Sequence, residues 1–334
     1  MSNWRSQLKH DPIVPLLSSE DPALVYFVKS DLLGEPAGPR HHLWQLPGTQ
    51  KILRKQLPDG SWPRYGEKKH PAINYALIET WKNFRFLVEL YGFTRQHPQA
   101  RQAAEFLFSC QTEEGDMRGM LANQYATYYT GAIMALLVQA GYQDDPRIER
   151  GFQWLLSMRR QSDGGWTIPI LTHKFDRATQ YRLTSQFAEP VEPDRSQPFS
   201  HNWTGMVLRA FAVHPTYRHS EAAKMGAQLL KSRFFQPDVY SSYRAASYWL
   251  RFGYPFWWNN LVAALDSISC IGASKDDRQI RQALDWLIDH QEQNGLWKIS
   301  YARQNEPEKQ TPKVQATKRW VSLAICRVFK RLYG

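Results

Sequence analysis

The sequence predicts an all-α protein built from repeated helix pairs, and three observations support this class. Apolar residues recur at i, i+3 and i+4 along many segments, which is the pattern of one helix face. A unit that ends in a Gln, a short turn containing Gly and often a Trp recurs along the chain. Sustained period-two runs and hairpin signals are missing, so a β-rich fold finds little support.

The repeated unit occurs in four clear copies and one degenerate copy. The clear copies are 51–62, 106–115, 154–166 and 286–297, and the degenerate copy is 229–238. The Gln residues before the turns of the clear copies are Gln56, Gln111, Gln161 and Gln291. A Gly in each of these turns accepts a positive φ without steric cost and ends the helix. We expect the Trp after the turn to lie over the helix end and tie adjacent repeats together.

A second, more apolar helix follows each copy. The predicted second helices are 73–92, 125–141, 201–214, 257–272 and 315–334, and Asp21 with Pro22 starts another over 21–33. We interpret these six as inner helices and the more charged first helices as outer ones. Residues 4–10 are interpreted as the remnant of a sixth outer helix.

The helix pairs should stack on one another, because one pair cannot bury its own apolar face. Six pairs can also close into a ring, which removes the exposed ends. We therefore predict an (α/α)6 toroid, with six inner and five to six outer helices, and keep an open solenoid as the alternative.

We expect one toroid domain over residues 1–334. Residues 1–42 form an N-terminal helical segment, and 43–334 carry the repeats. The connection 167–200 is predicted to be a lid, because loops over about 15 residues in a compact domain are usually functional or disordered. Its aromatic content argues against simple disorder.

The turn units resemble the QW motifs of squalene and oxidosqualene cyclases. Residues 283–297 are the best match, and 56–62 and 154–166 follow closely. The resemblance implies the α/α toroid of the terpenoid cyclase/protein prenyltransferase superfamily. That superfamily contains cyclases, prenyltransferases and non-catalytic members, so the resemblance is specific for fold and leaves the reaction open.

The resemblance also implies an acidic motif that the sequence lacks. Class II cyclases of this superfamily protonate an alkene with an Asp of a DxDD motif, and no DxDD is present here. The Asp pairs of the sequence, Asp144-Asp145 and Asp276-Asp277, each precede a predicted outer helix. An acid at that position caps free N–H groups and offsets the helix dipole, so we assign these pairs to capping.

A zinc site of the prenyltransferase kind is incomplete in this sequence. Those enzymes bind zinc through an Asp, a Cys and a His, and the His opens an inner helix in a His-Thr-x-Cys-Gly pattern. Here His201 and Gly205 match, but Thr204 replaces the Cys. A site with one His and no thiolate would not hold zinc tightly. No cofactor is therefore evident, and neither Zn²⁺ nor Mg²⁺ has a complete ligand set.

Three residues are candidates for acid–base chemistry. His201 opens an inner helix, and its reference pKa is near neutral; a role as the helix N-cap is the alternative. Glu79 and Asp266 lie inside apolar inner helices, where a carboxylate must be paired or have a raised pKa. Asp266 is the preferred proton donor, and a structural ion pair, for example with Arg209, is the competing interpretation.

Aromatic and polar residues at the starts of the inner helices are candidates for the wall of a cavity. Aromatic faces stabilise cations, by about 2 kcal/mol each when desolvated, and equally accept an apolar chain. Core packing is the alternative. These candidates are Tyr75, Tyr125, Tyr128, Tyr129, Trp203, Trp257, Trp258, Asn259, Asn260 and Trp320. Arg182, Arg244 and Lys318 are candidates to hold an anionic head group, against ordinary surface charge.

Composition limits the partners and the compartment. The formal net charge of +11 favours anions such as diphosphates and acidic membrane faces. The basic residues are scattered, and no nucleic-acid-binding motif is present. The three distant cysteines and the polar first ten residues favour a cytoplasmic protein without disulfides or a signal peptide, compatible with peripheral contact to an anionic membrane.

The leading functional hypothesis is a protein that binds or processes an isoprenoid, an isoprenoid diphosphate or another apolar, lipid-like molecule in an aromatic central cavity. Whether it is an enzyme stays open, because the DxDD and zinc motifs are missing or incomplete. A non-catalytic binding or scaffold toroid is the second hypothesis. A carbohydrate-active α/α toroid, which paired carboxylates about 5 to 9.5 Å apart would support, is the third.

Overall fold

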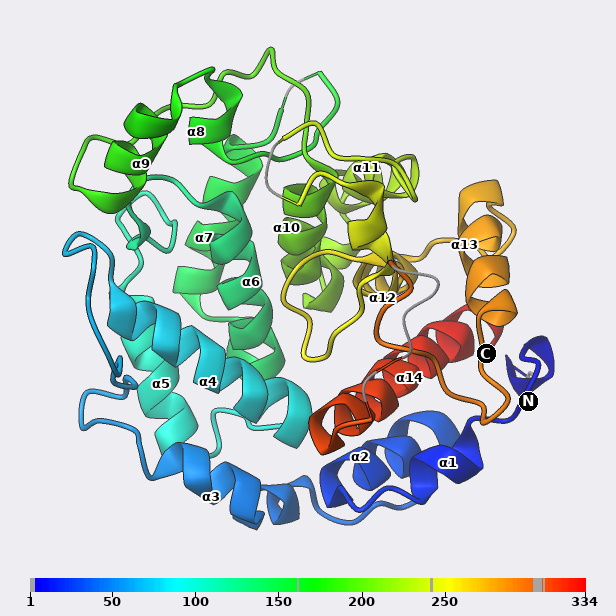
Figure 1. Cartoon of the computed structure of the whole chain (residues 1–334). Coiled ribbons are helices and arrows are strands. Elements are labelled where there is room, and N and C mark those ends of the chain that lie inside the picture. The colour runs from blue at the N-terminus through cyan, green and yellow to red at the C-terminus, as the bar shows by residue number, and fades with distance from the viewer. Residues whose placement is uncertain (1–3, 161, 241–242, 303–307, 309) are drawn as a thin grey trace. The chain divides into compact units, whose positions relative to one another are not determined.

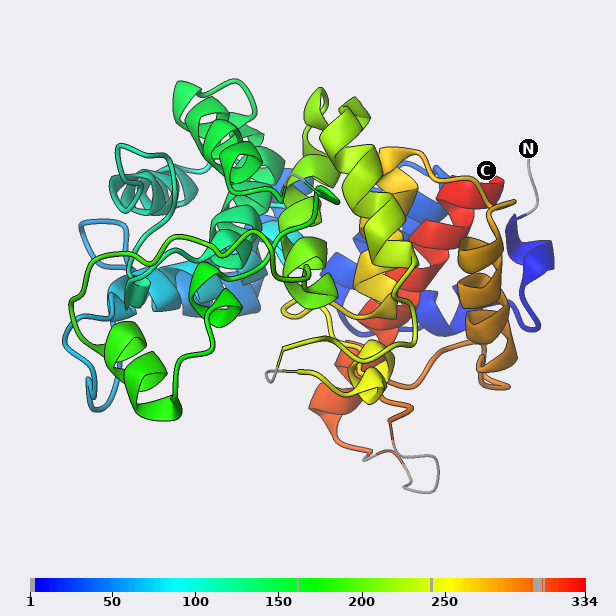
Figure 2. The ribbon, with the colours of Figure 1, turned by 90° about the horizontal axis from the view of Figure 1, so that it is seen from above.

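The computed structural model of the chain describes residues 4–160, 162–240, 243–302, 308 and 310–334. Within these residues the regular structure is helical except for one short strand, β1 (Met120–Asn123) (Figures 1 and 2). The predicted all-α class of helix-pair repeats, to which the α/α toroids belong, is confirmed. The chain forms two compact units: unit 1 is Met1–Arg40 with Ala227–Gly334, and unit 2 is His41–Gly226. The single domain over 1–334 stays a prediction.

Unit 2 contains three of the predicted helix pairs. They are α3 (Pro47–Leu53) with α4 (Tyr75–Tyr91), α5 (Pro98–Ser109) with α6 (Thr127–Leu137), and α7 (Pro146–Ser157) with α10 (His201–Val213). The π-helix η4 (Val138–Tyr142) continues α6, and the 3-10 helices are η3 (Arg40–Gln45) and η5 (Tyr217–His219).

The connection 167–200 was predicted to be a lid loop, but part of it is helical. It contains α8 (Pro169–Thr172) and α9 (Arg177–Ser185). The carboxylate of Asp176 accepts a hydrogen bond from the Thr179 N–H at 2.8 Å and thereby caps the start of α9.

Unit 1 holds the remaining helices. They are η1 (Trp4–Gln7), α1 (Ile13–Leu17), α2 (Pro22–Phe27), η2 (Val28–Leu33), η6 (Ala246–Leu250), α12 (Leu261–Ile271), α13 (Arg278–Asp289) and α14 (Pro312–Tyr333). The chain passes from unit 2 to unit 1 within α11 (Glu221–Lys231). The start predicted at Asp21 is confirmed, since its carboxylate accepts from the Ala23 N–H. The start predicted at Trp257 is wrong, because Asn260 caps α12 by accepting from the Ala263 N–H at 3.0 Å.

The Gln of each described clear repeat joins its own turn to the backbone of another segment of the chain. Gln111 Nε2 donates to the carbonyls of Gly115 at 2.8 Å and of Arg147, in the first turn of α7, at 2.9 Å. Gln56 and Gln291 make the same two kinds of bond, to Gly60 and Gln99 and to Gly295 and His10, respectively. Gln161 lies outside the described residues. These amides explain why the repeat places a Gln before its turn.

The Trp after the turn is held at both of its N–H groups. In unit 2, Trp166 Nε1 donates to the Leu155 carbonyl at 2.7 Å, and the Trp166 backbone N–H donates to Thr204 Oγ1 at 3.0 Å. The same two bonds recur for Trp62, with Ile52 and Thr80, and for Trp297, with Leu287 and Ser322. The Trp therefore ties the first helix of a pair to the second helix of the same pair, through its indole and its backbone N–H groups; the expected tie between adjacent repeats stays a prediction.

The second copy keeps the turn and loses the indole. Met117 stands where the other copies have Trp, and its backbone N–H still donates to Thr130 Oγ1 at 3.0 Å. Gly115 has a φ of +113°, and a Cβ at this position would lie 2.5 Å from the Arg150 carbonyl oxygen. Glycine is needed here both for the backbone conformation and for the close approach of α7.

Gly131 allows the close packing of α6 against α10. A Cβ on Gly131 would lie 2.7 Å from the Val207 Cα, which belongs to backbone and cannot rotate away. We predict that Gly131→Ala lowers the free energy of unfolding by about 1–3 kcal/mol, measured by urea denaturation. Gly253→Ala is the matched control, because no heavy atom lies within 4 Å of its added Cβ. Equal stability of the two variants would contradict this account of the α6–α10 contact.

No helix in the described part of the chain is long and apolar enough to cross a membrane.

Candidate functional site

Helices α6 and α10 of unit 2 bring predicted site residues together at their N-terminal ends, and α4 lies against α6. Helix α6 contacts both α4 and α10. Asn74 caps α4 by accepting from the Leu77 N–H, and Ser200 caps α10 by accepting from the Trp203 N–H. These caps fix where the helices begin, and so fix which residues of the first turns lie next to one another.

Four aromatic side chains form a continuous row across these three helices. The ring centroids of Trp81 on α4 and Tyr129 on α6 are 5.2 Å apart, those of Tyr129 and Tyr128 are 4.2 Å apart, and those of Tyr128 and Trp203 on α10 are 4.6 Å apart. Tyr129 is half-buried, and the other three are buried. We call Trp81, Tyr129, Tyr128 and Trp203 the aromatic row; three of its members were predicted, and Trp81 was not.

A buried cation lies at the Trp81 end of the aromatic row. The guanidinium carbon of Arg85, one turn after Trp81 on α4, is 5.2 Å from the centre of the Trp81 ring. Burial lowers the pKa of Arg85, and the nearby Glu89 and Tyr129 oppose that effect. The sequence analysis missed Arg85 and Glu89, which are four residues apart on α4 and therefore lie on one face of this helix.

His201, the predicted acid or base, is a buried residue at the start of α10. The alternative that it caps this helix is wrong, because Ser200 provides the cap. Thr204 occupies the position of the zinc-binding Cys in the prenyltransferase pattern. Its hydroxyl accepts from the Trp166 N–H and donates to the Trp166 carbonyl. This hydroxyl therefore holds the backbone of the Trp that follows the turn of the repeat.

Glu79 and Tyr75, both on α4, are engaged by basic residues. Glu79 accepts from Arg64 at 2.8 Å and from Lys82 at 3.0 Å. The guanidinium carbon of Arg64 also lies 5.5 Å from the centre of the Tyr75 ring, and the Tyr75 hydroxyl accepts from the His70 N–H. These contacts hold both side chains in an ionic surface network.

Tyr125 belongs to a different cluster from the aromatic row. Its hydroxyl donates to Glu114 Oε2 at 2.8 Å, and a Glu192 oxygen lies 3.3 Å away. Burial and these two carboxylates raise the pKa of Tyr125 far above its ordinary range, since a phenolate beside them would be repelled. The guanidinium of Arg118 packs over the ring, with its central carbon 4.6 Å from the ring centre.

The candidates of unit 1 gather at the starts of α12 and α14. The ring centroids of Trp257 and Trp258 are 5.9 Å apart, and Trp258 also contacts Tyr243. Asn259 and Asn260 are buried, and Asn260 is the cap of α12.

On α14, Trp320 stacks on Tyr254 with parallel rings 5.4 Å apart and donates from Nε1 to Asp21 at 3.0 Å. Lys318 forms ion pairs with Glu292 and Glu308, so its charge already has two carboxylate partners.

Asp266, the preferred proton donor, forms an ion pair with Arg331 of α14. The competing interpretation of Asp266 as a member of a structural ion pair is therefore supported, with Arg331 as the partner where Arg209 was the suggested example. Arg331 also donates to Ser269 Oγ at 2.9 Å, one turn after Asp266 on α12. Arg182 and Arg244, the other candidates for an anionic head group, are exposed.

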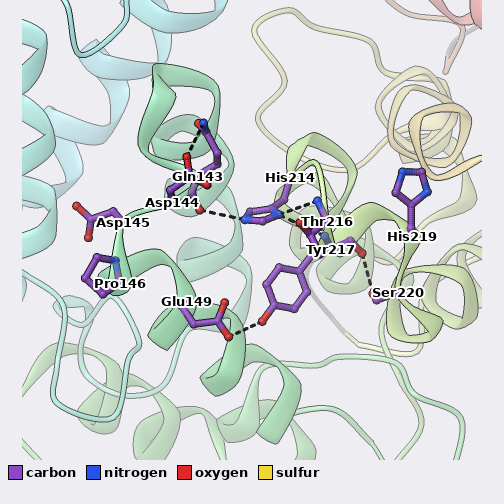
Figure 3. A pocket seen from close by; sticks show the side chains of 10 residues that line it. All are labelled: Gln143, Asp144, Asp145, Pro146, Glu149, His214, Thr216, Tyr217, His219 and Ser220. Carbon is purple, nitrogen blue, oxygen red and sulfur yellow. Dashed lines mark hydrogen bonds between the residues drawn. The ribbon is translucent and has the colours of Figure 1, made fainter.

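A pocket of about 710 Å³ opens at the opposite, C-terminal ends of η4 and α10 in unit 2 (Figure 3). His214 Nδ1 accepts from the N–H groups of Thr216 and Tyr217, both at 3.2 Å, while Nε2 faces the Gln143 carbonyl. The two N–H groups at Nδ1 match the tautomer whose Nε2 donates to the Gln143 carbonyl. The predicted site contributes no lining residue. The lining residues are Gln143, Asp144, Asp145, Pro146, Glu149, His214, Thr216, Tyr217, His219 and Ser220.

In the described ranges, no group of three or more His, Cys, Asp or Glu side chains is arranged to hold a metal ion. This finding adds no support for a metal cofactor.

The helix pairs, the indole ties and the aromatic row define an all-α protein of the terpenoid cyclase-like superfamily. The squalene-hopene cyclase C-terminal domain family matches residues 129–328. The chain belongs to this family.

The individual relatives and solved structures have low sequence identity to this chain. A squalene–hopene cyclase of Bradyrhizobium diazoefficiens is 28% identical over 145 residues, which cover 40% of this chain and 20% of the relative. Among solved structures, a protein from Actinoplanes is 16% identical with a TM-score of 0.47, covering 99% of this chain and 100% of the other. A type II terpene cyclase from Scytonema, solved with geranylgeranyl dihydroxybenzoate, is 13% identical with a TM-score of 0.46, covering 93% and 87%.

Proposed function

We propose that this chain binds an isoprenoid, or a similar apolar and lipid-like molecule, along the aromatic row. The observation that carries the proposal is the unbroken contact of four rings across α4, α6 and α10. Ring faces accept apolar chains over a large area. Membership of the squalene-hopene cyclase C-terminal domain family supports the same class of ligand, because the relative from Bradyrhizobium is named for squalene, an apolar hydrocarbon.

The charge at one end of the aromatic row suggests how such a ligand is oriented. Arg85 and Glu89 place charged groups beside Trp81, so a polar group of the ligand is better accommodated there than a hydrocarbon chain. Trp203 stands at the other end of the row. We expect the polar or diphosphate end of a ligand near Arg85 and its hydrocarbon chain near Tyr128 and Trp203.

The proposal is one of binding, and it does not extend to alkene protonation. The sequence has no DxDD motif. Two carboxylates were predicted as candidate proton donors. Glu79 forms ion pairs with Arg64 and Lys82, and Asp266 forms one with Arg331. These partners suit structural roles better than delivery of a proton to an apolar substrate.

The test measures binding and product formation together. Geranylgeranyl diphosphate and squalene are titrated into the protein by calorimetry, and the mixtures are then extracted and analysed for hydrocarbons by mass spectrometry. We expect micromolar binding, no new hydrocarbon, and affinity about 2- to 12-fold lower for Tyr129→Ala, since one aromatic contact contributes about 0.5–1.5 kcal/mol beyond its area.

Tyr333→Ala, at the C-terminal end of α14, is the control and should bind as the wild type does. Failure of both ligands to bind would contradict the proposal and favour a non-catalytic scaffold. A cyclised hydrocarbon product would show that binding alone is too narrow a description.

A further inference from the structure

The pocket beside His214 has a charge opposite to that of the whole chain. It is the hollow of about 710 Å³ at the C-terminal ends of η4 and α10 in unit 2 (Figure 3). Among the described residues that line it, Asp144, Asp145 and Glu149 are acids, and none is Lys or Arg. Since the sequence carries a formal net charge of +11, the pocket is a local reversal of charge. Its volume lies within the range of small-molecule sites.

Two of the pocket's carboxylates accept hydrogen bonds from neutral groups. Asp144 accepts from the Gln143 amide at 3.0 Å, and Glu149 accepts from the Tyr217 hydroxyl at 2.8 Å. Among the ion pairs between described residues, none engages Asp144 or Glu149. Asp145 differs, because it caps α7 and pairs with an Arg that does not line the pocket. A positively charged ligand would therefore meet two available carboxylates here.

The half-buried ring of Tyr217 is held in place beside one of these carboxylates. It stacks on Phe152, with centroids 4.0 Å apart and planes 9° from parallel, and meets His214 edge to face at 5.0 Å. Burial and the hydrogen bond to Glu149 raise the pKa of Tyr217 to about 12, so its hydroxyl stays protonated and donates to that carboxylate. Figure 3 shows the two side chains pointing toward each other. An ammonium group would find a carboxylate and an aromatic ring together there, the combination that recognises organic cations.

We propose that this pocket binds a small aliphatic amine of the polyamine class, with one ammonium group beside Glu149 and the Tyr217 ring and another toward Asp144. The ammonium groups of such a molecule supply both the positive charge and the hydrogen-bond donors that carboxylates accept. An anion would be repelled by the same carboxylates. An apolar chain would displace their water without replacing its hydrogen bonds. The proposal does not depend on a ligand in the aromatic row.

The test is isothermal titration calorimetry of the full chain with spermidine and with an uncharged diol of similar chain length. We expect spermidine to bind, more weakly as NaCl rises from about 0.05 to 0.5 M, and the diol not to bind. Asp144→Asn/Glu149→Gln should lower the affinity for spermidine by about 2- to 30-fold, because two exposed ion pairs are lost. Tyr217→Leu, which removes the ring, should lower it by about 2- to 5-fold.

Glu67→Gln/Glu113→Gln is the matched control, because it removes two exposed carboxylates of unit 2 that lie outside the pocket. It should bind spermidine as the wild type does, and circular dichroism checks that every variant is folded. The proposal is overturned if spermidine does not bind, if the diol binds equally well, or if the control loses as much affinity as the pocket variant. It is also overturned if equimolar Mg²⁺ displaces spermidine, since the site would then be one for an inorganic cation. Tighter binding of a short arginine-rich peptide than of spermidine would overturn it in favour of a protein partner.

Discussion

Trp166→Ala is expected to lower the free energy of unfolding by about 3–5 kcal/mol. The Trp166 side chain is fully buried in unit 2, where it contacts Phe211. Its indole N–H donates to the Leu155 carbonyl at 2.7 Å. Truncation therefore removes a large buried area, leaves a cavity, and leaves a buried carbonyl without its hydrogen bond.

Chemical denaturation monitored by circular dichroism measures this loss. Trp166→Phe should recover part of it, because the ring volume is largely restored while the hydrogen bond is not. Tyr181→Ala serves as the control, since Tyr181 is exposed and should change stability by about 0.5 kcal/mol or less. A loss for Trp166→Ala no larger than that of Tyr181→Ala would show that the indole tie does not stabilise the repeat.

Arg118→Met is expected to destabilise the protein by about 3–5 kcal/mol, because it leaves a buried carboxylate without its partner. Asp116 is fully buried and receives two hydrogen bonds from Arg118, at 2.7 and 2.8 Å. Burial alone would lower the pKa of Arg118, but the hydrogen bonds and charges of Asp116 and Glu114 raise it above its ordinary value.

A double-mutant cycle separates the pair from its surroundings. In Asp116→Asn/Arg118→Met the buried group is neutral, and its amide oxygen can still accept from Thr112, which donates to Asp116 Oδ1 at 2.5 Å. We expect the double variant to be more stable than Arg118→Met alone, as measured by thermal unfolding. Additive losses would contradict a coupled pair.

The repeat could be predicted because its causes are local in sequence. A Gly in the turn, a preceding Gln and a following Trp identify the helix ends, and the structure shows the bonds that each makes. Helix starts were predicted less well where the cap was overlooked. Asn260 delays the start of α12, and Asp176 starts a helix inside a segment predicted as a lid.

The site could be predicted only in part, because pairing between distant segments leaves no local sign. Tyr128, Tyr129 and Trp203 were named from the starts of α6 and α10, and the structure places them in one row. Arg331 as the partner of Asp266, 65 residues further along the chain, could not be found from spacing. Trp81 and Arg85 were missed because they lie in the interior of α4, beyond the helix start.

A crystal structure of the protein soaked with geranylgeranyl diphosphate is the most direct test of the aromatic row as a ligand site. The account predicts hydrocarbon density within about 4 Å of the rings of Tyr128, Tyr129 and Trp203, with the diphosphate toward Arg85. Density confined to the pocket beside His214, or rings packed so tightly that the soaked ligand finds no room among them, would contradict it.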